Sequence, residues 1–362
     1  MKKKNTLFIM IAIIILAIAG CSKKGSEDIE SESVSVAPTE NTTEMAETTA
    51  ETENHDNEVK SKLTGLWVPK EVGNKRPFAI ILNNLELASP QSGIAEADVL
   101  YEAIVEGGIT RFLGVFETLN DTRIGSVRSA RHYFVSFADE YDAIFVHYGE
   151  TTYATKKIAE LGVDNLSGLT GIAETVFYRD KSIKAPHNAF ASDAGIREGA
   201  GIKGYRLEYE EDYDGHFSFY EDDTDIVSNK DVEKINLNFT NYASPYFTYN
   251  EDDKLFYRYQ FGTEHNDFNT GEQLAFKNII VQFVKEWDID KNDYQTMDIE
   301  DATGTGYYIT NGKLVEITWT KNEASREMHY YDSKGNELRM NPGKTYIAIF
   351  PDNQVEDVVI SD

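Results

Sequence analysis

The sequence predicts a two-domain protein of the α+β or α/β class, in which an N-terminal mixed α/β domain precedes a mostly antiparallel, β-rich domain. In the first folded region, short apolar runs alternate with segments whose apolar residues have helical spacing. In the second, many short strands follow one another with turn signals about every 8 to 12 residues. We place the two domains at 61–230 and 231–362, after a leader at 1–20 and a tether at 21–60.

The chain begins with a three-part secretory leader. Lys2 to Lys4 give a positive start, Leu7 to Ala19 are almost all apolar, and small residues lead up to Cys21. A stable membrane span needs about 20 apolar residues, so this run is short for one. The pattern resembles the bacterial lipoprotein signal, in which the cysteine thiol takes a diacylglycerol before cleavage. The mature chain would then start at Cys21 and be held by its acyl chains (palmitate) on the extracytoplasmic face of the cell membrane. The alternative is an uncleaved N-terminal helix with an incidental cysteine.

The tether at 21–60 is rich in Ser, Thr and Glu and has almost no bulky apolar residues. Such a segment buries too little surface to offset its ordering entropy, so we expect it to be disordered. Its acidic charge favours an extended linker that lifts the folded part toward the cell wall. Because the chain has one cysteine, no intrachain disulfide can form, and a Gram-positive cell surface fits this usage best.

The formal net charge of -27 is unevenly distributed. The second folded region is strongly acidic, whereas the first is nearly balanced. The overall field would repel nucleic acid, which we exclude as a partner. The first region also contains four arginines close together, Arg111, Arg123, Arg128 and Arg131. Arginine pairs with carboxylates and phosphates through two parallel hydrogen bonds, so this concentration indicates internal ion pairs or an anionic ligand.

The elements of the first region follow from its apolar pattern. We expect strands at 78–82, 99–105, 111–117 and 143–148, and helices at 129–141, 151–161 and 193–198. Gly162 is expected to end the second helix. An acidic and aromatic segment at 208–225 leads to the second region.

The second region reads as an antiparallel sandwich or barrel. Its expected strands lie at 235–239, 246–248, 255–259, 278–287, 306–309, 314–319, 328–331 and 345–350. Turns are indicated at Asn311-Gly312, Ser333 to Asn336 and Asn341 to Gly343.

Several motifs carry a resemblance to a known family. RPFAIILNN, SPQSGIAEADVLYEAIVEGGITRFLGVF, IGSVRSARHYF, AIFVHYG and KAPHNAF follow in order, and HNDFNTGEQLAFKNIIV, GTGYYITNGK, ITW and NPGKTYIAIFP come later. Together they resemble the YerB-type family of bacterial lipoproteins, a domain of unknown function, over nearly all of Arg76 to Pro351. The resemblance implies a membrane-anchored, two-domain envelope protein. It supplies neither a reaction nor catalytic residues.

The charged motif residues suggest one candidate pocket in the first domain. Glu102 and Glu106 lie four apart on one expected strand and would share a face. Ser126 or Ser129 could cap the helix that follows, beside Arg128. The candidate pocket residues are Glu102, Glu106, Arg111, Arg128, Arg131, His147, His187 and Asn188. Two interpretations remain open: an internal ion network without a ligand, or an anion pocket for phosphate or a sugar carboxylate.

The histidines leave a further choice open. His132, His147 and His187 are either hydrogen-bonded structural residues or, with Glu150, metal ligands, and no spacing demands a metal. His265 with Asp267 and Asn269 forms either a turn network or a sugar contact. We expect no metal and no cofactor.

For function we favour a non-catalytic protein that binds or regulates in cell-wall synthesis or remodelling. Its partners would be peptidoglycan, another anionic wall component, or wall-synthesis proteins. The alternative is a hydrolase or transferase that acts on wall polymer with Glu102, Glu106 and a histidine. No nucleophile elbow, phosphate loop or dinucleotide fingerprint supports it.

Overall fold

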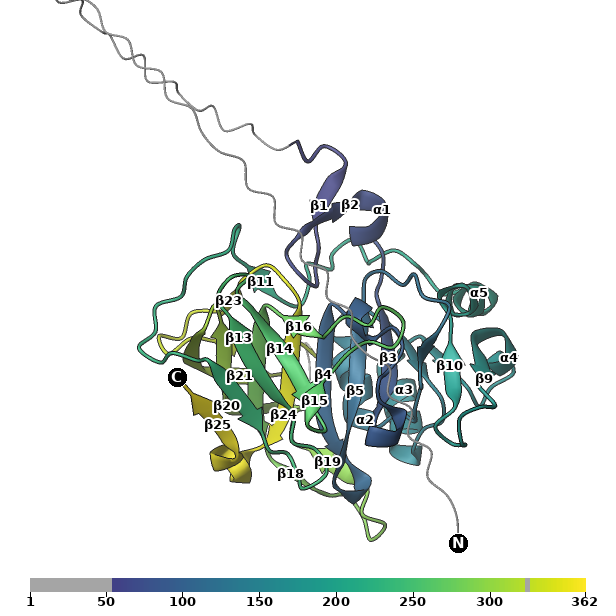
Figure 1. Cartoon of the computed structure of the whole chain (residues 1–362). Helices are drawn as coiled ribbons and strands as arrows, with labels where there is room; N and C mark the ends of the chain where they lie inside the picture. Colours follow the sequence, from purple (N-terminus) through teal and green to yellow (C-terminus); the bar gives the residue numbers. More distant parts are fainter. Residues whose placement is uncertain (1–53, 323–325) are drawn as a thin grey trace, which may run out of the picture. The chain divides into compact units, whose positions relative to one another are not determined.

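A computed structural model describes residues 54–322 and 326–362 of the chain, which belong to one compact unit (Figure 1). The expected leader, the lipidation residue Cys21 and most of the tether lie outside the described residues. Within them, no helix is long and apolar enough to cross a membrane. The predicted fold class is confirmed: a mixed α/β half precedes a mostly antiparallel half.

A ten-stranded sheet forms the centre of the unit. Its strands, in spatial order, are β22 (Met328–Tyr331), β21 (Lys313–Lys321), β20 (Ala302–Thr310), β17 (Asn278–Val284), β24 (Thr345–Pro351), β4 (Val99–Val105), β5 (Ile109–Phe116), β3 (Phe78–Asn84), β7 (Ile144–His147) and β8 (Asn165–Ser167). The strands predicted from apolar runs are all found here or in the second sheet, and those at 99–105 and 328–331 have the predicted bounds.

The sheet is continuous across the two halves of the sequence. β24 pairs in parallel with β17 on one side and with β4 on the other, so that Thr345 lies opposite Val99. In Figure 1 the yellow strand β24 accordingly stands beside the blue strand β4. The expected boundary near residue 230 therefore divides the sequence without dividing the central sheet.

Seven strands of this sheet run in the same direction; one is β21, and the other six form two parallel groups. β17, β24 and β4 are parallel, β5 reverses between β4 and β3, and β3, β7 and β8 are again parallel. Their carboxyl ends meet at one side, which we call the carboxyl edge; the six final residues are Val284, Pro351, Val105, Asn84, His147 and Ser167. In sheets with parallel strands, ligands bind outside such an edge.

Both faces of the ten-stranded sheet are covered. One face packs against helices α2 (His132–Asp139) and α3 (Thr152–Leu161). The other face packs against helix α5 (Asp193–Lys203) and an antiparallel sheet. This second sheet contains β15 (Thr263–Glu264), β14 (Leu255–Gln260), β13 (Tyr246–Asn250), β12 (Lys234–Leu237), β25 (Val358–Ser361) and β16 (Ala275–Phe276). Alternate side chains of each central strand enter the two cores, as the near-continuous apolar runs predict.

Local signals explain several boundaries and correct others. The Thr151 hydroxyl accepts from the backbone of Ala154, and Gly162 ends α3 in the left-handed conformation, as predicted. α2 begins at His132 instead of Ser129, its N-cap is Arg131, and no side chain caps it. The expected serine cap is therefore wrong, because the preceding residues are held in strand-like pairing.

Two further expectations needed correction. The end of the expected tether is ordered, since β1 (Glu58–Lys60) pairs with β2 (Trp67–Pro69). Helix α5 continues five residues past the predicted end at 198. The remaining elements are α1 (Lys70–Gly73), α4 (Ala173–Val176), β6 (Ile124–Gly125), β9 (Phe177–Arg179), β10 (Ala189–Ala191), β11 (Ser218–Phe219), β18 (Glu286–Asp288), β19 (Gln295–Met297) and β23 (Arg339–Met340), with 3-10 turns η1 (Glu86–Ala88), η2 (Ile94–Glu96), η3 (Glu106–Gly108) and η4 (Asp352–Asp357).

Candidate functional site

The segment 126–131 forms the floor of the candidate site at the carboxyl edge. On one side it bonds to β3, where Asn83 N donates to Ser126 O and Arg128 N donates to Ile81 O, both at 2.9 Å. On the other side, Tyr148 N donates to Arg128 O at 2.9 Å. The segment is thus wedged between the ends of β3 and β7. This pairing fixes the backbone of two arginines at an edge where ligands commonly bind.

Three arginines gather there, and we call Arg111, Arg128 and Arg131 the arginine cluster. Arg131 makes a two-pronged ion pair with Glu106: its Nε lies 2.8 Å and 2.9 Å from the two carboxylate oxygens. Arg111 Nη1 donates to the backbone oxygen of Ser129 at 2.6 Å. Arg128 Nη1 donates to Pro186 O at 2.8 Å, while its buried Nε has no hydrogen-bond partner. Three cations therefore face a single directly paired carboxylate.

The pKa values of Arg111 and Arg128 are both lowered. Burial, together with the charges of Arg131 and Arg128, lowers the pKa of Arg111 to about 9. Burial and then the charge of Arg131 also lower the pKa of Arg128. A lowered arginine pKa means that the positive charge is destabilised where it sits. An anion at this position would relieve the repulsion.

His187 adjoins the arginine cluster from the loop that precedes β10. Its Nδ1 lies 3.0 Å from Asn83 Nδ2, and the same amide donates to Ser126 Oγ at 3.2 Å. Burial and the charges of Arg128 and Lys184 lower the pKa of His187. The imidazole is therefore neutral at neutral pH. With Nδ1 accepting from the amide, Nε2 carries the proton and can donate to a ligand.

Glu102 lies on the other face of the sheet and takes no part in this site. Strand β4 ends at Val105, and Glu106 begins a tight turn in which Gly107 has a φ of 78°. Arg111 pairs with Ala103, so its side chain points to the face opposite that of Glu102. The expectation that Glu102 and Glu106 share one face of a strand is therefore wrong. Sequence spacing could not reveal where the strand ends.

Glu102 instead belongs to a fully buried set of polar groups between the two sheets. Its carboxylate accepts from Asn84 Nδ2 (2.9 Å), Thr110 Oγ1 (2.6 Å), Tyr346 OH (2.6 Å) and Arg258 Nη2 (2.6 Å). Glu102 and Arg258 are both 0% exposed. We call this set, with His265 and Gln91, the Glu102–Arg258 network.

His265 extends the Glu102–Arg258 network, and its contacts favour a turn network over a sugar contact. Its Nδ1 contacts Arg258, and its Nε2 lies 2.6 Å from Gln91 Oε1. Burial and the charge of Arg258 keep its pKa well below the usual range. The neighbouring Asp267 accepts from the backbone of Asn269 at 2.6 Å and from that of Ala95 at 2.9 Å. The motif is thus a turn network that binds the second half to the first.

His147 and Asn188 are also occupied by internal contacts. His147 is fully buried, with Nδ1 2.9 Å from Gly149 O and Nε2 3.3 Å from Asn165 Oδ1. Asn188 Oδ1 accepts from Arg179 at 2.8 Å. They support the loops around the arginine cluster and offer no free polar atom toward it. Across 54–322 and 326–362, no three His, Cys, Asp or Glu side chains are arranged to hold a metal ion.

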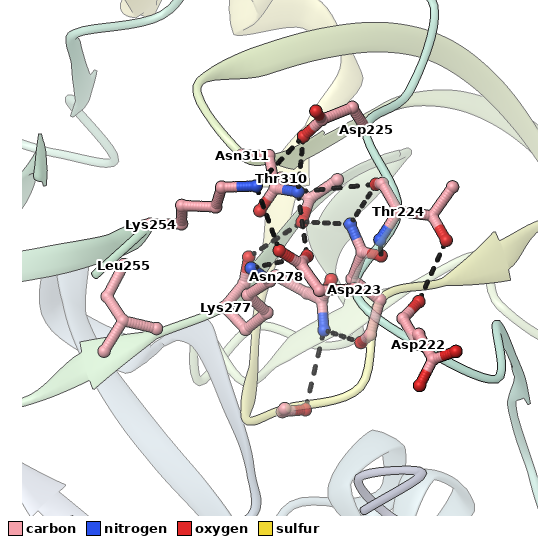
Figure 2. Close-up of polar contacts among 12 residues, drawn as sticks. Asp222, Asp223, Thr224, Asp225, Lys254, Leu255, Lys277, Asn278, Thr310 and Asn311 are labelled. Carbon is pink, nitrogen blue, oxygen red and sulfur yellow. Dashed lines mark hydrogen bonds and ion pairs between the residues drawn. The ribbon is translucent and has the colours of Figure 1, made fainter. Parts of the chain in front are cut away.

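The acidic linker contains a polar cluster that the sequence did not single out (Figure 2). Asp223 contacts Lys277 Nζ at 2.7 Å, Asn311 Nδ2 at 2.8 Å and Lys254 Nζ at 3.1 Å. The next residue, Thr224, donates its N–H to Asn341 Oδ1 at 2.7 Å. These contacts fasten the linker between the halves to the second half. This cluster could not be predicted from the sequence, because Asp223 is far along the chain from its partners Lys254 and Lys277.

A cavity of about 580 Å³ lies at the opposite edge of the sheet, before β3, β7 and β8. Carboxylates predominate in its lining, and its arginines already have carboxylate partners: Arg76 pairs with Asp142 and Asp164, and Arg206 with Asp142. This edge is therefore negative where the carboxyl edge is positive, which makes it a poor place for an anion.

The mixed ten-stranded sheet, to which both halves of the sequence contribute strands, defines an α+β protein. Comparisons with known proteins identify its family. Models of the N-terminal and C-terminal domains of a protein of unknown function, DUF3048, match residues 63–206 and 235–347. The chain is 34% identical over 296 residues to a Bacillus subtilis protein named "Putative lipoprotein YerB", covering 81% of this chain and 87% of that protein. The crystal structure of YerB from Bacillus subtilis matches with a TM-score of 0.74 and 31% identity over 84% of this chain and 100% of that chain. The chain belongs to the DUF3048 family.

Proposed function

We propose that this chain is a lipid-anchored, extracytoplasmic binding protein that recognises an anionic group of the cell envelope at the arginine cluster. One observation carries the proposal: three arginines meet at the carboxyl edge with one paired carboxylate, Glu106, among them. Guanidinium groups bind carboxylates and phosphates through paired hydrogen bonds, and these are worth more where the site is partly buried. Peptidoglycan and other anionic wall polymers offer such groups. The role is binding or regulation in wall synthesis or remodelling.

The anchor in this proposal is Cys21. Support comes from the leader pattern and from the name of the Bacillus subtilis relative as a lipoprotein. Because this thiol is the only cysteine acceptor in the chain, Cys21→Ala should leave an unlipidated, unprocessed precursor. Metabolic labelling with a fatty-acid analogue tests this, and a labelled Cys21→Ala chain would contradict it.

The ligand is tested by incubating the purified full chain with peptidoglycan fragments and with teichoic-acid fragments, followed by mass spectrometry. We expect the protein to retain one set of fragments without changing their mass. Salt should release them, because it screens ionic contacts. Arg128→Ala should weaken this retention. Arg206→Ala is the matched control and should not, since Arg206 lies at the opposite edge and has its own carboxylate partner. Retention of neither set would contradict the proposal.

The same experiment addresses the hydrolase or transferase alternative. A pair of carboxylates that cleaves a glycosidic bond must flank it at about 5 to 9 Å. Glu102 instead is buried between the two sheets, Glu106 lies in the turn after β4, and both are bound to arginines. We therefore expect fragments of unchanged mass. Shortened products that disappear in Glu106→Gln would restore the enzymatic interpretation.

A further inference from the structure

A small antiparallel sheet connects the arginine cluster to a second surface. In it, β10 pairs with β6 on one side and with β9 on the other, so that Phe190 lies opposite both Gly125 and Tyr178. The segment that follows β6 leads to Arg128, and the segment that precedes β10 contains Pro186. A hydrogen bond from the Arg128 side chain to the Pro186 backbone oxygen joins the two segments. The arginine cluster thus lies at one end of the ribbon and Phe190 toward the other. Arg128 follows Gly125 by three residues along this ribbon.

Aromatic rings and one arginine form a layered surface at that other end. The Tyr178 and Phe190 rings stack with centroids 6.1 Å apart and an interplanar angle of 28°. The guanidinium of Arg123 lies 3.7 Å from the centroid of Phe190 and 5.2 Å from that of Phe268. Tyr178 and Phe268 are 42% and 57% exposed. We call these four residues the aromatic surface.

The aromatic surface is held in place and its charge is balanced. Arg123 Nη1 pairs with Asp180 at 2.8 Å, and its Nε donates to Ser92 Oγ at 3.0 Å. The backbone N–H of Phe268 donates to Gln91 O at 2.8 Å. Arg123, which the sequence grouped with the other arginines, therefore has a different environment: it is neutralised and serves as a flat support between rings. Single exposed aromatics are common, but two on one fixed stack, supplied by both halves of the chain, are unexplained by core packing.

We infer that the ligand of the arginine cluster is an acidic glycan whose sugar rings lie on the aromatic surface. The apolar C–H face of a sugar packs on an aromatic ring, while its carboxylate or phosphate reaches the arginines along the ribbon. This inference rests on the proposed function and narrows its ligand class. It also explains why the exposed rings adjoin the excess positive charge while Arg123 is kept neutral.

The test compares tetragalacturonate, galacturonate, neutral cellotetraose and tetraglutamate, titrated into the full chain in neutral detergent. Tetragalacturonate should bind most tightly. Phe268→Ala should weaken it about three- to tenfold and leave galacturonate unchanged, the range expected from losing one aromatic contact. Arg128→Ala should weaken both acidic sugars. Trp287→Ala removes another exposed aromatic elsewhere, 44% exposed against 57% for Phe268, and should change nothing.

Each outcome separates the two claims. Equal affinity for tetragalacturonate and galacturonate, with no effect of Phe268→Ala or of a second variant, Tyr178→Ala, overturns the glycan inference and leaves the anion site standing. Tighter binding of tetraglutamate that depends on Phe268 overturns it in favour of an acidic peptide. If no acidic probe binds and Arg128→Ala changes nothing, the proposed function itself fails. Thermal melting of each variant excludes unfolding as the cause.

Discussion

Two groups of charges, one fully buried and one partly buried, lie on opposite faces of the same sheet, and they differ in charge balance. In the Glu102–Arg258 network, one carboxylate accepts four hydrogen bonds and faces one arginine, and both charged residues are fully buried. In the arginine cluster, three guanidinium groups face one carboxylate, and Arg128 Nε has no partner. Both groups contain a buried guanidinium Nε without a hydrogen-bond partner, that of Arg128 and that of Arg258, so they differ in the excess of positive charge, which occurs only in the arginine cluster. The charges of the first arrangement are balanced without a ligand, and those of the second are not.

The largest expected effect is on stability, from breaking the complete network. Arg258→Ala leaves the Glu102 carboxylate buried without its cation, which should lower the free energy of unfolding by about 3 to 5 kcal/mol. Denaturant titration measures the loss. The double variant Glu102→Gln/Arg258→Met leaves no buried charge and should recover part of it. A loss below about 1 kcal/mol would show that the network is not the structural element we describe.

A smaller effect on stability, with an effect on binding of opposite sign, is expected from Glu106→Gln. Removing the paired carboxylate should cost about 1.5 kcal/mol, because the pair is only partly buried. The affinity for anionic fragments should rise severalfold, since less negative charge then opposes the ligand. Calorimetric titration and denaturation on the same samples measure both. A loss of affinity would mean that Glu106 contacts the ligand.

The pH dependence of Glu106 sharpens this comparison. Burial would raise its pKa, but the hydrogen bonds and charge of Arg131 outweigh burial and lower it from 4.5. A carboxyl with a lowered folded-state pKa stabilises the fold above its unfolded pKa and loses this contribution as the pH falls through the folded value. The free energy of unfolding, measured from about pH 6 to about pH 3, should therefore fall more steeply with falling pH in the parent protein than in Glu106→Gln. Parallel curves would contradict the ion pair.

A moderate effect on binding is expected from His187. Its pKa is lowered from 6.5 by burial and by the charges of Arg128 and Lys184, so the ring gains its proton at a lower pH than an ordinary imidazole. A bound anion stabilises the protonated ring, and affinity should thus rise as the pH falls. Sulfate is a suitable probe because its charge is constant in this range. His187→Asn should flatten the dependence; an unchanged slope would exclude His187 from the site.

The smallest effect is expected in the linker cluster of Figure 2. The side chain of Asp223 is 40% exposed although it contacts two lysines, so water and salt screen the pairs. Asp223→Asn should cost less than about 1 kcal/mol, and added salt should reduce the difference further. Unfolding in low and high salt tests this. A loss as large as that in Arg258→Ala would make the linker part of the core.

Much of the fold was predictable because local patterns specify it. The apolar runs at 99–105 and 345–350 and the capped helix from Thr151 to Gly162 gave nearly the observed bounds. The pairing of β24 with β4 was not predictable, since contacts between residues 99 and 345 leave no local signal. The start of α2 was missed because pairing of 126–131 with β3 overrides its helical spacing.

The candidate site was predictable in part. Arginine spacing pointed to Arg111, Arg128 and Arg131, and the structure brings these together with Glu106 and His187. It separates them from Glu102, because β4 ends at Val105 and Glu106 lies in the following turn, so a spacing of four residues no longer places both on one face. It also separates Arg123, whose partner Asp180 is distant in sequence. Arg258, the cation of Glu102, was missed because it lies in an ordinary alternating strand of the second half.

The account depends most directly on whether the arginine cluster is incomplete without a ligand. Affinity for the retained wall fragments and free energy of unfolding should be measured on the same preparation of Arg128→Ala. We expect affinity to fall about 10- to 150-fold, the value of a lost hydrogen bond to a charged group, while stability changes by less than about 1 kcal/mol. Unchanged affinity with a large loss of stability would contradict the account and make the cluster a second internal network.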